Sequence, residues 1–297
     1  MIDWLDGVWS RAVAVQVLDG GEDGGDLDRR ELLAEVSQPQ ALARARELMT
    51  AGTFTGGICR CLGGMTVVLR DAGGAVLGAA SVHGYGTLSW ERSRFRDDLE
   101  VADPAALHLF LAEQGVPGQL AQFHADLVGL LGLREGTPQF RQAGREGKAL
   151  AEARRVLAAR RVPAVLHGPL SAVSGQQAAE LDGARLDAIR ALLVADVPDP
   201  VARAGVLLEW LGRLPAEAEA FWGEGVLVRR LLADLSGQDL VAAVAGSGSG
   251  HVAMGVVHWS RWHGADASLV AAVAPTLRRL FPPPAGRGRR RPARVRP

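Results

Sequence analysis

The pattern that most constrains the fold is a pair of strand-like runs on either side of a short glycine turn. Residues 65–71 read MTVVLRD, residues 75–83 read AVLGAASVH, and the sequence AGG lies between them. Valine-rich runs of this length are typical of strands, and a short turn containing glycine joins such strands as a β-hairpin. We therefore predict an antiparallel hairpin over residues 65–83.

The hydrophobic pattern changes close to residue 117. Before it, further strands are expected at residues 11–18 and 86–91, two helical segments between residues 29 and 49, and a helix capped by Asp103. After it, apolar residues recur at three-to-four spacing, which is typical of helices. The expected helices span residues 120–131, 140–161, 181–194, 200–214, 225–245 and 252–262.

These patterns predict an α+β fold in three parts. Residues 1–116 form a small sheet-and-helix domain, and residues 117–281 form an all-helical array or bundle. Residues 282–297 form a disordered Pro/Arg-rich tail. The whole chain has 33 basic and 33 acidic residues, but six arginines and no acid lie in residues 287–296. The tail is thus either a weak, salt-sensitive nucleic-acid contact or a solubilising extension.

Composition excludes several classes of protein. Two cysteines in 297 residues cannot form a disulfide framework, and no apolar run reaches the roughly 18 residues of a membrane span. Lys148 is the only lysine and is not followed by Ser or Thr, so no phosphate-loop motif is present. The first residues are acidic. We therefore expect no secretory signal, no membrane contact and a cytoplasmic location.

The candidate site consists of two cysteines before the hairpin and a histidine at its far end. A three-residue turn puts Cys61 opposite Tyr85 and places Cys59, Cys61 and His83 on one face of the sheet. A two-residue turn moves His83 to the opposite face, because a shift of one residue exchanges the faces. The site hypothesis therefore depends on the turn.

Three kinds of chemistry fit these residues. Cys59, Cys61 and His83 are candidate zinc ligands, with His108 or His124 as a distant fourth ligand. Residues two apart in a regular strand lie about 6.5–7 Å from each other, so the two thiolates need a bulge, which the flanking glycines allow. In the second interpretation, Cys61 is a nucleophile and His83 is its base. In the third, the cysteines form a reversible thiol sensor. We nevertheless expect no bound cofactor, because two small apolar cysteines and one hydrogen-bonded histidine that fill a packed sheet explain the pattern without one.

A resemblance adds to this pattern. The sequences CRCLG at residues 59–63, VHG at 82–84 and LSW at 88–90 resemble those of uncharacterised proteins from high-GC bacteria, in which a C-x-C-x-G hairpin precedes a helical half. The resemblance covers mainly residues 55–115 and implies no particular activity. Those proteins often have His-His-Gly and Leu-Arg-Trp, so this chain lacks a second histidine and an arginine.

The sequence has no phosphate-loop, G-x-G-x-x-G or G-x-S-x-G motif. We therefore expect a non-enzymatic interaction or regulatory protein whose helical domain contacts another protein. The first alternative is a thiol- or metal-dependent enzyme or sensor centred on Cys59, Cys61 and His83. The second is a nucleic-acid-associated protein that uses the arginine-rich tail.

Overall fold

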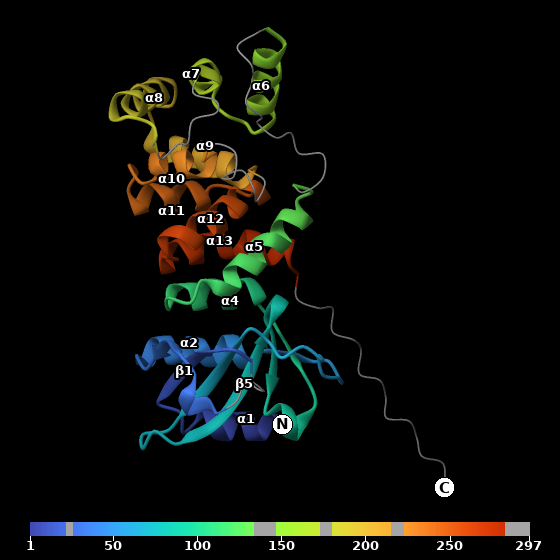
Figure 1. Ribbon diagram of the computed structural model, residues 1–297. Helices are drawn as coiled ribbons and strands as arrows, with labels where there is room; N and C mark the ends of the chain where they lie inside the picture. The colour runs from blue at the N-terminus through green and yellow to red at the C-terminus, as the bar shows by residue number, and fades with distance from the viewer. Residues whose placement is uncertain (22–25, 134–146, 173–179, 215–222, 283–297) are drawn as a thin grey trace. The chain divides into compact units, whose positions relative to one another are not determined.

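The computed structural model describes residues 1–21, 26–133, 147–172, 180–214 and 223–282. The chain divides into two compact units (Figure 1). The N-terminal unit comprises Met1–Gln119 and the chain from Arg278 onward, and the helical unit comprises Leu120–Leu277. An antiparallel sheet in the first unit and helices in the second make the fold α+β, as the sequence predicts.

The N-terminal unit is built on a seven-stranded antiparallel sheet with the strand order β2-β1-β4-β5-β6-β7-β3. Its strands are β1 (Ala14–Asp19), β2 (Leu32–Val36), β3 (Gly52–Phe54), β4 (Met65–Arg70), β5 (Val76–His83), β6 (Thr87–Trp90) and β7 (Leu99–Val101). The predicted hairpin is the β4–β5 pair at the centre of the sheet. The helix expected between residues 29 and 36 is wrong, because β2 occupies most of that segment and pairs with β1.

The register of the hairpin changes along its length. Next to the turn Arg70 pairs with Val76, as a three-residue turn requires. A bulge between Leu69 and Arg70 then shifts the register by one residue, so that Met65 pairs with Val82. The expectation of a single register is therefore wrong, since the end nearest the cysteines has the register of the two-residue alternative.

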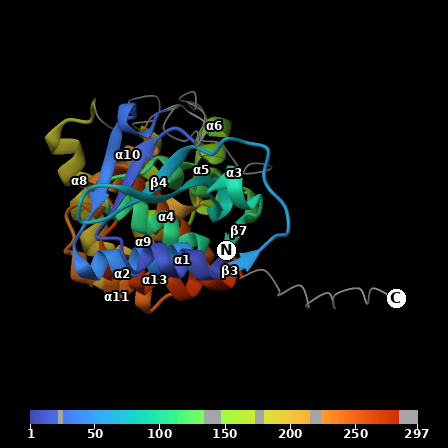
Figure 2. The ribbon, with the colours of Figure 1, turned by 90° about the horizontal axis from the view of Figure 1, so that it is seen from below.

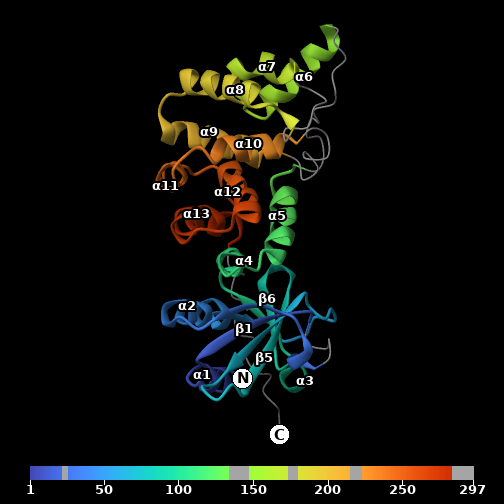
Figure 3. The same ribbon diagram turned by 60° about the vertical axis from the view of Figure 1, so that its left-hand side comes forward.

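One face of the sheet carries the apolar core of this unit. The buried side chains of Val17, Val67, Val82 and Leu88 alternate along their strands and share one cluster with apolar residues of three helices. These helices are α1 (Ile2–Trp9), α2 (Pro39–Thr50) and α4 (Pro104–Glu113). Figures 2 and 3 show α1 and α2 on the same side of the sheet. The opposite face has a much smaller apolar cluster around Val68.

Local capping explains where several helices begin. The Asp103 carboxylate accepts the Ala106 N–H at 3.0 Å, and Pro104 occupies the first turn of α4, as predicted. The helix predicted over residues 225–245 is instead two helices, because Ser236 and Asp239 form a capping box that starts a new one.

The helical unit is built from helices throughout the part of it that the structure describes. They are α5 (Gly118–Leu130), α6 (Gly147–Ala159), η3 (Ala164–Leu166), α7 (His167–Ala172), α8 (Gly183–Asp196), α9 (Pro200–Gly212), α10 (Glu224–Leu232), α11 (Gly237–Ala245), α12 (Gly250–His263) and α13 (Ala267–Leu280). Helix α9 contacts α10, α11 and α12. None of the helices in the described ranges is both long and apolar enough to cross a membrane.

Helices α9 and α12 touch through their backbones at two glycines. A Cβ atom on Gly212 would lie 1.7 Å from the carbonyl oxygen of His251, and one on Gly255 would lie 2.1 Å from that of Leu208. Only glycine fits at these positions, so the crossing itself selects the residue type.

Candidate functional site

A row of buried polar side chains crosses the face of the sheet opposite the apolar core that packs on α1, α2 and α4. Thr66 pairs with Ser81 and Ser81 with Ser89 on three neighbouring strands, and the β6–β7 register continues from Ser89 to Asp98. All four residues are at most 3% exposed. His83 lies two residues after Ser81 in β5, on the same face, and is also buried. Buried polar groups need partners, so this row demands a local hydrogen-bond network.

The two cysteines reach this row from a loop rather than from a strand. Residues 55–64, here called the cysteine loop, have no helix or strand. Gly63 has a φ of +81°, and a Cβ atom there would lie 2.8 Å from the carbonyl oxygen of Val82. Glycine thus lets the loop turn close against β5 before β4 begins. The strand before the loop, β3, ends at Phe54, so both cysteines lie outside the strands.

The loop brings Cys59, Cys61 and His83 together despite the register shift. The two Sγ atoms lie 2.8 Å apart, and Cys61 Sγ lies 2.8 Å from His83 Nδ1. The three ligand atoms all lie within 4.8 Å of one another. Cys59 and Cys61 lie in a loop and not in a strand. The separation of about 6.5–7 Å between residues two apart in a regular strand therefore does not limit the distance between their thiols.

A chain of hydrogen bonds determines which nitrogen of His83 carries its proton. Ser89 Oγ donates to the Asp98 carboxylate, so its hydrogen is already used. Ser89 Oγ must then accept from His83 Nε2, which lies 2.8 Å away. His83 Nδ1 is left with a lone pair directed at Cys61 Sγ. This orients the histidine as a ligand or proton acceptor towards Cys61.

Two charged side chains hold the backbone of the cysteine loop. Asp98 Oδ2 accepts the backbone N–H of Cys59 at 2.5 Å. The Arg92 guanidinium donates to the carbonyl oxygen of Cys59 at 2.5 Å and also to that of Cys61. Charge-assisted bonds of this kind are stronger than neutral ones, so the loop is fixed on both sides of Arg60.

The protonation of the site follows from these contacts. The hydrogen bond with the Cys61 thiol raises the pKa of the Cys59 thiol, and burial adds to the increase. Burial lowers the pKa of His83; the Asp98 carboxylate opposes this change, and the Arg92 charge adds to it. His83 is therefore neutral at pH 7 and keeps the Nδ1 lone pair that faces Cys61.

The other residues considered with the site do not join it. Within the described part of the chain, Cys59, Cys61 and His83 form a three-residue cluster of possible metal ligands that includes neither His108 nor His124. His108 lies in α4, and His124 lies in α5 within the helical unit. The side chain of Tyr85 and residues 283–297 lie outside what the structure describes.

The sequence interpretation missed three residues that complete the site. Arg92 and Asp98 lie in a charge-rich segment whose sequence predicts a surface turn, although Asp98 is 3% exposed. Ser89 was noted only as a departure from the Leu-Arg-Trp pattern. Alternation in residues 87–90 places Ser89 on the same face as His83, and this was the available signal.

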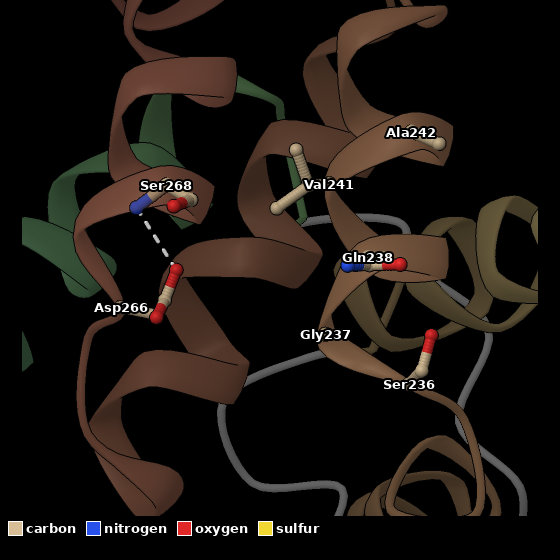
Figure 4. Close-up of a pocket in the computed structure, with 7 residues that line it drawn as sticks. All are labelled: Ser236, Gly237, Gln238, Val241, Ala242, Asp266 and Ser268. Carbon is tan, nitrogen blue, oxygen red and sulfur yellow. Dashed lines mark hydrogen bonds between the residues drawn. The ribbon is translucent and has the colours of Figure 1, made fainter.

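A cavity of about 650 Å³ lies in the helical unit, at the N-termini of α11 and α13 (Figure 4). The Asp266 carboxylate accepts the N–H groups of Ser268 and Leu269 at 2.9 and 3.0 Å, and the Ser236 hydroxyl accepts the N–H of Asp239. These polar groups cap the helix ends, and the residues that line the cavity include no cysteine or histidine.

Comparison with protein-family models, curated proteins and solved structures finds no match to this chain. The similarity to uncharacterised proteins from high-GC bacteria stays a prediction and assigns no activity. The geometry around Cys59, Cys61 and His83 therefore carries the functional argument.

Proposed function

We propose that the N-terminal unit binds one soft divalent metal ion, with zinc as the reference ion, through Cys59, Cys61 and His83. The observation that carries the proposal is the convergence of two thiols and one imidazole nitrogen within 4.8 Å. Zinc prefers this donor set, with bonds of about 2.3 Å to sulfur and about 2.0–2.1 Å to nitrogen. Its tetrahedral ligands then lie roughly 3.5–3.8 Å apart, which side-chain shifts of about 1 Å provide.

The groups behind the ligands support this assignment. A histidine that binds a metal through one ring nitrogen usually donates a hydrogen bond from the N–H group of the other, and the acceptor fixes the orientation of the ring. His83 Nε2 does so through Ser89, which is itself bound to Asp98. The Cys61 N–H also points at Cys59 Sγ at 3.4 Å.

Three protein ligands leave one tetrahedral position for water or an incoming molecule. Structural zinc sites are closed by four protein ligands, whereas catalytic sites keep an open position. Cys61 is exposed and Cys59 is partly exposed, so the open position is accessible from solvent. This favours a reactive or regulatory metal over a purely structural one.

Metal analysis of the reduced protein tests the proposal. We expect one zinc ion per chain in wild type and loss of that ion in Cys59→Ser, Cys61→Ser and His83→Gln variants. His263→Ala is the matched control, because His263 is an exposed histidine of the helical unit. Native mass spectrometry with zinc competition by a chromophoric chelator gives stoichiometry and affinity. A reduced wild type that takes up no zinc, cobalt or nickel overturns the proposal.

The 2.8 Å contact between Cys61 Sγ and His83 Nδ1 favours a second candidate, a thiol nucleophile with histidine as its base. This candidate requires metal-free protein in which iodoacetamide alkylates Cys61 faster than free cysteine and in which His83→Gln abolishes that advantage. Alkylation of wild type and variant at the same slow rate refutes it.

The expected compartment, protein partner and nucleic-acid contact are supported by the sequence more than by the geometry of the site. Two free thiols are consistent with a reducing cytoplasm as the compartment. A protein partner for the helical unit and a nucleic-acid contact through residues 285–297 stay predictions that no contact in the structure tests.

A further inference from the structure

Cys59 and Cys61 are close enough to form a disulfide with little movement. Their Sγ atoms lie 2.8 Å apart, and a disulfide bond is about 2.05 Å long. The sulfurs therefore need to approach by about 0.8 Å. Rotation of two short side chains supplies this shift.

The backbone around the pair is held by charged groups that do not touch the two sulfur atoms. Asp98 binds the N–H of Cys59, and Arg92 binds the carbonyl oxygens of both cysteines. On the two cysteines these contacts use main-chain atoms only, so forming a bond between the sulfurs breaks none of them. The loop therefore keeps the two cysteines in a fixed relation to each other.

The two thiols differ in access. Cys61 is exposed and Cys59 is partly exposed. An oxidant from solvent therefore reaches Cys61 first, and Cys59 is the neighbouring thiol that resolves the oxidised product. Thiol sensors commonly combine an accessible cysteine with a resolving one in this way.

We propose that Cys59 and Cys61 form a redox switch in which a peroxide converts the pair to a disulfide and thereby releases the bound metal ion. The release rests on the proposed metal-binding function, whereas the disulfide step rests on the thiol geometry alone. The oxidant is hydrogen peroxide, and the reductant class that reverses the step is a dithiol.

The oxidation proceeds in two steps. The Cys61 thiolate attacks a peroxide oxygen; the O–O bond breaks, the sulfur becomes a sulfenic acid, and the departing hydroxide takes a solvent proton to give water. The Cys59 thiolate then attacks the Cys61 sulfur; the S–O bond breaks, and a second hydroxide leaves and is protonated to water. Two electrons pass from the sulfurs to the peroxide, and of the three candidate ligands only His83 would remain to hold a metal ion.

The disulfide is readily reversible. Closing a ring between residues two apart removes little entropy from the unfolded chain, so the bond adds little stability. An exposed disulfide of this kind is reduced more easily than a buried structural one. A dithiol reductant restores both thiols and the metal ligands.

Peroxide titration of the zinc-loaded, full-length protein tests the switch. We expect one zinc ion released to a chromophoric chelator for each disulfide formed, seen by intact mass as the loss of two hydrogen atoms, and full recovery on addition of dithiothreitol and zinc. Zinc retained without a change in mass overturns the switch and leaves the metal site standing. A reduced protein that never binds zinc overturns the proposed function, and the mass change then decides the disulfide step alone.

Two variants test the order of attack. In metal-free Cys59→Ser we expect a sulfenic acid at Cys61 that dimedone traps, because the resolving thiol is absent. In metal-free Cys61→Ser we expect at least about tenfold slower reaction with peroxide. His263→Ala is again the matched control and should behave as wild type. Equal peroxide rates for Cys61→Ser and wild type overturn the assignment of Cys61 as the first thiol.

Discussion

Asp98→Asn tests whether the buried network positions the candidate metal ligands. Asp98 contacts none of the candidate ligand atoms. Its Oδ1 accepts from the Ser89 hydroxyl, and its Oδ2 accepts the backbone N–H of Cys59 at 2.5 Å. Asparagine keeps the shape of the side chain but replaces one acceptor oxygen with an NH₂ donor. The substitution therefore changes hydrogen-bond polarity without creating a cavity.

Either orientation of the new amide disturbs the site. With its NH₂ group towards Ser89, Ser89 must donate to His83 Nε2, and the His83 proton moves to Nδ1, where it blocks ligation. With its NH₂ group towards Cys59, two donors face each other and the loop loses an anchor. A lost partner behind a metal ligand typically lowers affinity about 10–100-fold. This corresponds to about 1.4–2.8 kcal/mol, the same range as one unsatisfied buried donor.

Zinc competition with a chromophoric chelator measures this loss, and urea denaturation of the metal-free protein measures stability separately. Glu100→Gln is the matched control, because Glu100 is an exposed acid two residues away in β7. We expect wild-type affinity for the control and a loss of about 10–100-fold for Asp98→Asn. Affinity of Asp98→Asn within about twofold of wild type would refute the positioning role, whatever the change in stability.

Three further predictions address the rest of the chain. Burial lowers the pKa of His108 from 6.5 to about 4. Only the unfolded chain takes up this proton below pH 6.5, so the free energy of unfolding should fall by up to about 3 kcal/mol between pH 7 and 4, and His108→Leu should flatten this dependence in urea denaturation. Gly255→Ala places a Cβ 2.1 Å from the Leu208 carbonyl oxygen and should lower the free energy of unfolding by about 1–3 kcal/mol. Gly205→Ala places a Cβ with no atom within 4 Å and should raise it by up to about 1 kcal/mol, as measured by thermal unfolding. Deleting residues 285–297 should abolish any salt-sensitive binding to nucleic acid, and unchanged binding at low salt would exclude the tail.

The parts of the fold that follow local rules could be predicted from the sequence. The β4–β5 hairpin follows from alternation and a glycine turn, and α4 follows from Asp103 with Pro104. Residues 32–36 have apolar positions that suit a helix or a strand, and only pairing with β1 makes them β2. Pairing partners are distant in sequence, so local patterns cannot decide such a segment.

The site was within reach of sequence reasoning only in part. Cys59, Cys61 and His83 stand out by residue type, but strand pairing brings them together only if it continues regularly up to the cysteines. The bulge next to Arg70 breaks this assumption, and the glycines of the cysteine loop restore proximity by another route. Asp98 reaches the site because β6 pairs with β7. The charged segment between these two strands predicts a surface turn, so the sequence does not indicate that Asp98 is buried.

The structure also bears on whether the site exists only to fill the sheet. A purely structural role accounts for His83, Ser89 and Asp98, because buried polar groups must find hydrogen-bond partners. It does not account for Cys61, which is exposed and buries little apolar surface, yet directs its thiol at the one free acceptor of the histidine. Cys61→Ser should therefore change the stability of the metal-free protein by less than about 0.5 kcal/mol while abolishing metal uptake. A large loss of stability without loss of metal would favour the structural explanation.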